Sequence, residues 1–313
     1  HAKKIRPSHR AVVLEYGMSA RGHLRRSCKI IQPNITIITM IGTAHIGNVG
    51  GTVEGLIRAK SGIIFNMKQT GTLLLNADDV NSGQLNTGKF NGTILYVGIN
   101  NEADYQAVDV RYSRYGMKFR VGLHDIYHDF FIPIWGKHNV YNALFAIAVA
   151  DHLGFSPRQI KIGLKAYRKP PRRLRVYRRK KRVRIIDDTF NANPNSVKAA
   201  IDVLSSIGKG RNIAVLGSMS ELGRYSRRGH KEVGRYLADK NVTRLFTFGA
   251  KARVIGKEAI SHGFSSQRVV HSSNRNTLHK RLKRTIISGS TVLVKGSHNL
   301  RMNKTVHFLR HRA

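Results

Sequence analysis

The feature that most constrains this chain is the regular alternation of short apolar runs with longer helical stretches in its second half. The runs are rich in valine and isoleucine, which favour buried strands, and the stretches between them repeat apolar residues at helical spacing. Because consecutive parallel strands need a helical crossover, this alternation predicts an α/β fold with a doubly wound parallel sheet. The predicted strands are 182–189, 212–218, 244–249, 267–271 and 291–297, and the predicted helices are 195–208, 230–240, 252–263 and 275–286.

The first half of the chain has a similar but less regular pattern. Runs 11–17, 34–42 and 71–79 predict buried strands, and the stretch 21–33 predicts a helix. The stretch 138–154 has apolar residues around much of its circumference, which predicts a largely buried helix. Four further runs alternate or cluster like strands of a more antiparallel layer, at 93–99, 108–113, 117–124 and 128–136.

The segment RKPPRRLR, residues 168–175, is the best candidate for a boundary between two domains. Its double proline resists both a helix and a central strand, and positive charge rises sharply there. We therefore expect domains at 1–168 and 169–313, each long enough to bury its own core. A hydrophobic fraction of 41% excludes a mainly disordered chain.

Positive charge dominates the composition, with 55 Lys and Arg against 17 Asp and Glu, a net charge of +38. Residues 1–150 carry 17 basic and 9 acidic side chains, whereas residues 151–313 carry 38 and 8. The densest stretch, 168–184, has 11 basic residues in 17, but it includes apolar residues such as Leu174 and Val183 and is not a simple tail. Because basic surfaces release counterions from nucleic acid, a non-catalytic nucleic-acid-binding module stays open as an alternative, and incidental polyanion binding is expected in any case.

The single cysteine, Cys28, excludes a disulfide framework and suits a reducing compartment, so we expect a cytoplasmic protein. No run approaches 18 apolar residues, so the sequence predicts no membrane span. The first residue is histidine rather than methionine, and we interpret the chain as a piece of a longer protein.

Polar side chains stand in or directly after several apolar runs, and ligands of open parallel sheets bind at the carboxyl ends of strands. Glu15 lies in an apolar run, where an acid has to be solvated, paired or bound to a cation. The glycine-rich loop 42–51 contains His45, and such a loop lets the backbone approach a phosphate. Each residue also has a plain structural explanation, such as a surface histidine or a helix cap. Their joint occurrence is what indicates a site.

Nine strings in these segments resemble the Mur ligase family, and within it the MurF type. One such string arises easily by chance, but nine in the family's order along nearly the whole chain do not. The resemblance implies a partial central ATP-binding domain, with a mostly parallel sheet and helices, followed by a C-terminal Rossmann-like domain. The strings are VLEYGMSARGHL, IGTAHIGNVGG, AKSGII, NADD, GKHNVYNALFAIAVA, RRLRVY, IIDDTFNANPNSVKAA, VLGSMSELG and VKGSHNLRM.

The resemblance also implies catalytic and metal-binding roles. Glu15 matches an acid that binds Mg²⁺ near the ATP phosphates, and His45 matches a ligand of a second Mg²⁺. Lys60 matches a lysine that is carbamylated in the family and then acts as a metal ligand. Arg173 matches an arginine that reaches the γ-phosphate, so Lys60, His45 and Arg173 are the expected catalytic residues.

Further matching residues are expected to bind the nucleotide and the second substrate. Asn139 and Asn142 match the pair that contacts adenine, Arg173 also belongs to the nucleotide site, and Asp188 matches the acid on the ribose. Five residues match positions that face the interdomain cleft, where an incoming dipeptide would lie: Asn191, Asn193, Lys295, Ser297 and Arg301.

The implied activity is that of an ATP-dependent amide ligase of peptidoglycan synthesis. It adds D-alanyl-D-alanine to UDP-N-acetylmuramoyl-tripeptide through an acyl phosphate, because phosphorylation turns a carboxylate oxygen into a leaving group that an amine can displace. Family members begin with a UDP-sugar domain and a GxxxxGK[ST] phosphate loop, and this sequence contains no such motif. We therefore expect the chain to be inactive alone, with a degenerate relic as a further alternative.

Overall fold

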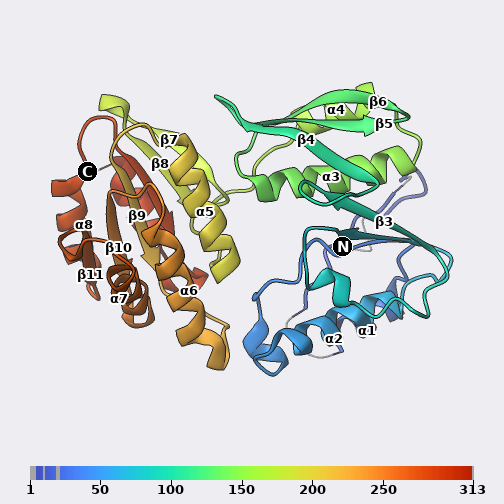
Figure 1. The fold of residues 1–313 in the computed structure, drawn as a ribbon, viewed down its shortest axis with the longest axis horizontal. Coiled ribbons are helices and arrows are strands. Elements are labelled where there is room, and N and C mark those ends of the chain that lie inside the picture. Colours follow the sequence, from blue (N-terminus) through green and yellow to red (C-terminus); the bar gives the residue numbers. More distant parts are fainter. Residues whose placement is uncertain (1–4, 10, 19–21, 312–313) are drawn as a thin grey trace.

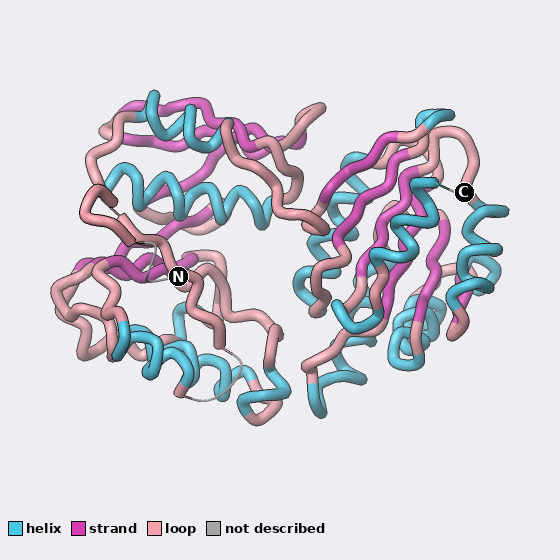
Figure 2. Tube along the Cα trace, turned by 180° about the vertical axis from the view of Figure 1, so that it is seen from behind, coloured by secondary structure: helices cyan, strands magenta, loops and turns pink. Residues whose placement is uncertain are grey.

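The computed structural model of the chain describes residues 5–9, 11–18 and 22–311. These residues form two lobes, each built around a six-stranded sheet, and a short segment, 166–174, connects them (Figure 1). Seen from behind, the two sheets are again separate and the same connection runs between them (Figure 2). Among the described residues, no helix is long and apolar enough to cross a bilayer.

The sheet of the first lobe has its strands in sequence order, β1 to β6. The pairs from β1 to β4 are parallel, whereas β4, β5 and β6 pair antiparallel. The more antiparallel layer is therefore confirmed for the runs 108–113, 117–124 and 128–136, but the placement of 93–99 in it is wrong, because β3 pairs parallel with both of its neighbours. The elements are α1 (His23–Ile30), β1 (Ile35–Ile37), α2 (Val53–Ile64), β2 (Thr72–Asn76), β3 (Thr93–Gly98), β4 (Tyr105–Tyr112), β5 (Met117–Leu123), β6 (Ile126–Ile132), α3 (Lys137–His152) and α4 (Pro157–Lys165).

Burial explains the regular elements of this lobe. All five residues of β2 are buried, as expected of a strand covered on both faces. Helix α3 buries Val140, Leu144 and Ile147 against the sheet. Thr52 caps the N-terminus of α2, and its hydroxyl accepts a hydrogen bond from the Gly55 N–H at 3.1 Å.

The second lobe is the predicted doubly wound sheet, with strand order β11-β10-β9-β12-β8-β7. Every pair is parallel except the edge pair of β7 and β8, which is an antiparallel hairpin. The elements are β7 (Arg175–Arg178), β8 (Arg184–Asp188), α5 (Pro194–Ile207), β9 (Asn212–Gly217), α6 (Ser226–Ala238), β10 (Arg244–Phe248), α7 (Arg253–Ser261), β11 (Val269–Ser272), α8 (Arg275–Thr285), β12 (Thr291–Lys295) and α9 (Asn303–His311).

Two apolar layers hold this sheet between its helices. Helices α5, α6 and α7 cover one face of the sheet. The apolar residues between them and the strands belong to a large core that continues into the first lobe. Helices α8 and α9 cover the other face, where Leu278, Leu282, Val306 and Leu309 form a separate core with the strands. Figure 1 shows α5 and α6 on the side toward the first lobe and α8 on the side away from it.

The predicted strand at 11–17 is wrong. Residues 11–18 have no regular secondary structure, and the Val13 side chain is 96% exposed. A segment of β-branched residues forms a strand only where a neighbouring strand is available to form backbone hydrogen bonds with it. The predicted strand at 34–42 shortens to β1, and Arg21, where the first predicted helix begins, lies outside the described residues.

Candidate functional site

The two lobes meet where the loop after β1 faces the strand ends of the second sheet. Thr43 of this loop donates from its backbone N–H and from its hydroxyl to the Asn195 side-chain oxygen, at 3.2 and 3.0 Å. Asn195 lies in the first turn of α5. Farther along the loop, the Gly47 N–H donates to the Glu221 carbonyl at 3.2 Å. Segments that follow β1 in the first lobe and β8 and β9 in the second lobe therefore form one junction.

Glycine allows the closest contact in this junction. A Cβ atom on Gly47 would lie 2.6 Å from the Gly223 nitrogen and 2.9 Å from the Leu222 carbonyl carbon, closer than real Cβ atoms approach. Gly51, with a φ of +73°, packs against the Arg224 side chain, which donates to the Gly50 carbonyl. Gly47 therefore admits the backbone of the second lobe and Gly51 admits the Arg224 side chain, a use of these glycines that the sequence does not reveal.

His45 faces the second lobe. Its Nδ1 lies 2.9 Å from Glu221 Oε2, an ion-pair distance when the imidazole is protonated, although the atoms do not have hydrogen-bond geometry. Both residues have left-handed backbones, with φ of 60° for His45 and 61° for Glu221. Such conformations are uncommon outside glycine, and they cluster at functional sites and switch regions.

Lys60 lies within α2, and most of its side chain is covered. Burial lowers the pKa of the Lys60 ammonium, and the negative charge of Asp79 partly opposes this. Asp79 is held in place because its Oδ2 accepts hydrogen bonds from the Ile41 N–H at 2.7 Å and the Ser82 hydroxyl at 2.6 Å. A lysine with a lowered pKa is uncharged more often and therefore more nucleophilic toward an electrophile such as carbon dioxide.

The predicted magnesium ligands do not form a visible metal site. Among the described residues, no three carboxylate, imidazole or thiol side chains converge as metal ligands do. Glu15 is exposed in the irregular segment 11–18, and His45 faces Glu221. These residues as placed do not fit a Mg²⁺ ion, so the magnesium assignment stays a prediction and no chemical step is derived through it.

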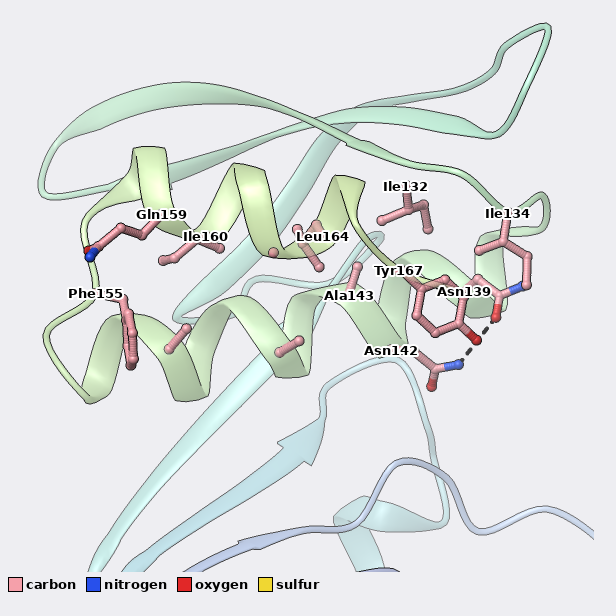
Figure 3. A pocket seen from close by; sticks show the side chains of 13 residues that line it. Ile132, Ile134, Asn139, Asn142, Ala143, Phe155, Gln159, Ile160, Leu164 and Tyr167 are labelled. Carbon is pink, nitrogen blue, oxygen red and sulfur yellow. Dashed lines mark hydrogen bonds between the residues drawn. The ribbon is translucent and has the colours of Figure 1, made fainter. Parts of the chain in front are cut away.

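Asn139 and Asn142 line one end of an apolar pocket between α3 and α4, with a volume of about 490 Å³ (Figure 3). The Asn142 amide donates to Asn139 Oδ1 at 3.4 Å, and the Asn139 amide donates to the Trp135 carbonyl at 2.8 Å. Tyr167, from the segment that connects the lobes, lies next to the pair, whereas Phe155 lies at the far end. Amides offer both donors and acceptors to the edge of a flat polar ligand whose ring enters the apolar pocket.

The connecting segment brings Arg173 to the strand ends of the second lobe. Its guanidinium lies over the Phe190 ring, 4.2 Å from the centroid. On either side, Arg172 and Leu174 have positive φ, 62° and 46°. This strained backbone is held by the Leu174 N–H, which donates to Asp188 Oδ1 at 3.1 Å, and by the Arg172 carbonyl, which accepts from the Phe190 N–H at 3.1 Å.

Lys295 and Asp188 form a buried ion pair at the ends of β12 and β8. The Lys295 ammonium lies 2.5 Å from Asp188 Oδ2 and 2.9 Å from the Asn191 carbonyl. His138 lies near this pair, and burial lowers the pKa of its imidazole while the Asp188 charge opposes the shift. Asp188 and Lys295 therefore lie at the junction, and each already contacts another group of the protein.

The remaining predicted substrate residues divide into structural and exposed ones. Asn193 is the N-cap of α5, accepting from the Ser196 N–H at 2.9 Å. Ser297 is buried, and its hydroxyl accepts from the Ser220 N–H at 2.8 Å. Asn191 and Arg301 are exposed, and Arg301 has a φ of 49°. Their roles toward a substrate stay predictions.

Sequence reasoning missed three junction residues. Phe190, which supports Arg173, and Asn195, which binds Thr43, both lie in the string IIDDTFNANPNS, but nothing in the string distinguishes them from ordinary loop residues. Glu221 lies in the string VLGSMSELG, which gives no sign that this acid reaches the first lobe. Its pairing with His45 depends on a contact between segments more than 170 residues apart, which no local signal encodes.

Two family profiles match the chain in succession. One, described as the Mur ligase middle domain, matches residues 2–150, and another, described as the glutamate ligase domain of Mur ligases, matches residues 172–298. The chain belongs to the Mur ligase family. The two matches leave residues 151–171 between them, so the domain boundary at residue 168 stays a prediction.

Two curated relatives of this Mur ligase chain share a name. The chain is 34% identical over 295 residues to the UDP-N-acetylmuramoyl-tripeptide--D-alanyl-D-alanine ligase of Bacillus subtilis, and this match covers 94% of the chain and 63% of the relative. The Haemophilus influenzae enzyme of the same name is 28% identical over 307 residues, with 98% and 66% covered. The chain therefore spans slightly less than two thirds of the length of these relatives.

Solved structures agree with this assignment. MurF from Acinetobacter baumannii superposes on this Mur ligase chain with a TM-score of 0.89 at 27% identity, covering 98% of the chain and 66% of that structure. MurF from Thermotoga maritima in complex with ADP has a TM-score of 0.80 at 24% identity, with 92% and 64% covered, and supports the fold. Neither the relatives nor these structures favour a nucleic-acid-binding module.

Proposed function

We propose that this chain is the nucleotide-binding and C-terminal part of a MurF-type ligase, which joins D-alanyl-D-alanine to UDP-N-acetylmuramoyl-tripeptide at the expense of ATP. The observation that carries the proposal is the paired amides of Asn139 and Asn142 at the end of an apolar pocket, beside Tyr167 of the connecting segment. A purine is flat and apolar on its faces and carries donors and acceptors on its edge, so it suits this pocket. The ATP and the UDP-linked substrate place the proposed reaction in the cytoplasm.

The residues of this chain have distinct parts in the proposed reaction. ATP supplies the phosphoryl group that activates the tripeptide carboxylate for attack by the dipeptide amine. Arg173, held between two strained residues, provides a fixed positive charge for a phosphoryl group in transfer. The Lys295–Asp188 pair fixes the backbone of Leu174, next to Arg173, so it is a positioning element. Packing of the 42–51 loop against Gly223 brings the two lobes together and would exclude water.

The proposal is tested with the protein expressed from its complete coding sequence, by following ADP and amide formation with all three substrates. We expect ADP formation to require the tripeptide and the dipeptide, and Arg173→Ala to reduce kcat by a factor on the order of 10³. No amide product from a protein that folds as described would contradict the proposal.

Nucleotide binding is measured separately with a fluorescent ATP analogue. Asn142→Ala removes an amide at the nucleotide end of the pocket and is expected to weaken binding about tenfold, the loss typical of one or two hydrogen bonds. Gln159→Ala is the matched control because Gln159 lines the same pocket near Phe155, away from the asparagine pair. Equal losses in the two variants would contradict the placement of the base.

A further inference from the structure

The second lobe has a strongly uneven distribution of charge. After Glu258, the remaining 55 residues contain no aspartate or glutamate but 11 lysines and arginines. The hairpin of β7 and β8 adds a continuous basic run, Arg178–Arg182. Apart from Lys295 and Arg301, which belong to the candidate site, neither the proposed nucleotide pocket nor the junction uses these residues.

The fold brings the hairpin and the last helices together. Lys181, in the hairpin turn, accepts through its carbonyl from the Gly289 N–H at 2.9 Å and the Ser288 hydroxyl at 3.1 Å, which places the turn beside the loop after α8. Arg179 donates to the Leu309 carbonyl of α9 at 2.6 Å. We call the resulting surface the basic face, defined by six exposed residues: Lys180, Lys181, Arg182, Lys283, Arg284 and Arg310.

Ion pairing distinguishes the basic face from the opposite side of the lobe. On the α5–α7 side, several lysines and arginines have carboxylate partners, for example Lys198 with Glu232 at 3.4 Å and Lys231 with Glu258 at 3.1 Å. None of the ion pairs found among residues 5–9, 11–18 and 22–311 involves a member of the basic face. Its positive charge is therefore available to an external polyanion.

The aromatic residues near the basic face are already engaged, which disfavours single-stranded nucleic acid. The Tyr177 ring is contacted by Arg310 at 4.1 Å and by Arg175 at 5.3 Å, and Phe308 stacks on His279 at 4.1 Å. Bases bind such surfaces by stacking on free aromatic rings, and these rings are not free.

One apolar side chain stands among these positive charges. Ile287, three residues after Arg284 and next to the Ser288 that contacts the hairpin, is 49% exposed. Basic residues around an exposed apolar side chain suit the interface of a lipid bilayer, where cations meet phosphate headgroups and the apolar group enters the acyl boundary.

We propose that the basic face is a peripheral docking surface for a bilayer of anionic phospholipids. Figure 1 shows α8 on the side of the lobe away from the first lobe, so a bilayer bound there leaves the junction accessible. Binding is electrostatic in origin and falls as salt shortens the range of the attraction, which is about 8 Å at physiological ionic strength.

The test is co-sedimentation of the complete protein with vesicles of phosphatidylcholine and phosphatidylglycerol, against vesicles of phosphatidylcholine alone. We expect binding to the mixed vesicles only, and loss of it at high salt. The quadruple change Lys181→Gln, Arg182→Gln, Lys283→Gln and Arg284→Gln is expected to weaken binding by a factor on the order of a hundred or more. Thermal unfolding of each variant verifies that it is folded.

A matched control removes the same number of charges from the α6–α7 side, through exposed residues outside the basic face. It carries Arg227→Gln, Lys251→Gln, Arg253→Gln and Lys257→Gln, and we expect vesicle binding to fall less than tenfold. Equal losses in the two variants would show that net charge rather than this face is responsible, and would overturn the proposal.

Nucleic acid is the competing partner, and two measurements separate it. Binding of the protein to duplex DNA and to RNA is measured at a nucleic-acid phosphate concentration equal to that of the accessible lipid phosphate. Tighter binding to either nucleic acid than to the mixed vesicles would overturn the proposal. Ile287→Ser is expected to weaken vesicle binding several-fold and to leave nucleic-acid binding unchanged, because only a bilayer offers an apolar phase to this side chain. Failure of vesicle binding has no bearing on the ligase activity, which is measured separately.

Discussion

The ammonium of Lys295 lies 2.5 Å from the Asp188 carboxylate, and the two residues are register partners at the ends of the neighbouring parallel strands β12 and β8. Both side chains are nearly buried, with 4% and 13% of their surfaces exposed. The same carboxylate holds the connecting segment through the Leu174 N–H. One ion pair therefore ties the central strands of the second sheet to the segment that leads to the other lobe.

Replacing Lys295 with methionine leaves the Asp188 carboxylate buried without its counter-ion. We expect a loss of about 3–5 kcal/mol in the free energy of unfolding, measured by urea denaturation, because an unpaired buried charge is strongly destabilising. The exposed Lys257→Met is the control and is expected to change stability by less than about 0.5 kcal/mol. Adding Asp188→Asn to Lys295→Met removes the charge and is expected to recover part of the loss. A double variant less stable than Lys295→Met would contradict this explanation.

The sequence predicts the second lobe well because its signals are local. Alternating apolar runs and helical stretches give the strands β8 to β12 in order, and the parallel pairing follows from the length of the crossovers. The edge strand β7 escapes prediction because Arg175–Arg178 is half charged and forms a strand only through its hairpin with β8. The helix α9 is short, and the sequence pattern did not indicate it.

The candidate site is less predictable because its contacts join distant segments. Asn139 and Asn142 are close in sequence, so their shared helix face follows from their spacing. The approach of Gly47 to Gly223 and of His45 to Glu221 depends instead on how the two lobes dock. Glu15 shows the opposite failure, because its apolar neighbours indicate a strand that has no partner among the described residues.

The lowered pKa of Lys60 predicts a pH dependence of stability. The folded state releases the Lys60 proton at lower pH than the unfolded state, whose pKa stays near 10.5, so the buried ammonium is destabilising at neutral pH. As pH rises toward 10.5, this penalty disappears. We expect Lys60→Met to be more stable than the parent protein at pH 7, with the difference shrinking toward pH 10 in urea titrations. A difference that stays constant across that range would contradict the lowered pKa.

Gly47→Ala is expected to separate the lobes without unfolding either. Its Cβ atom would meet backbone atoms of Gly223, Leu222 and Glu221 at 2.6, 2.9 and 3.0 Å, and backbone cannot move aside as a flexible side chain can. We expect a larger radius of gyration in small-angle X-ray scattering and faster proteolysis within residues 166–174. Gly62→Ala is the matched control: nothing lies within 4 Å of its added methyl group, and within α2 it is expected to add up to about 1 kcal/mol of stability. Unchanged scattering from Gly47→Ala would show that the lobes do not depend on this contact.

His279 predicts a loss of stability in mild acid. Burial, assisted by the charge of Arg275, lowers the pKa of His279 to about 4, while the unfolded state keeps a pKa near 6.5. Between these values the unfolded state binds a proton that the folded state does not, so stability falls as pH drops from 6.5 to 4. His279→Phe keeps a ring that can stack on Phe308, from which the imidazole centroid is 4.1 Å away, but cannot titrate. We expect the variant to lose less stability than the parent protein over this pH range in urea titrations, and parallel pH profiles for the two proteins would contradict the assignment.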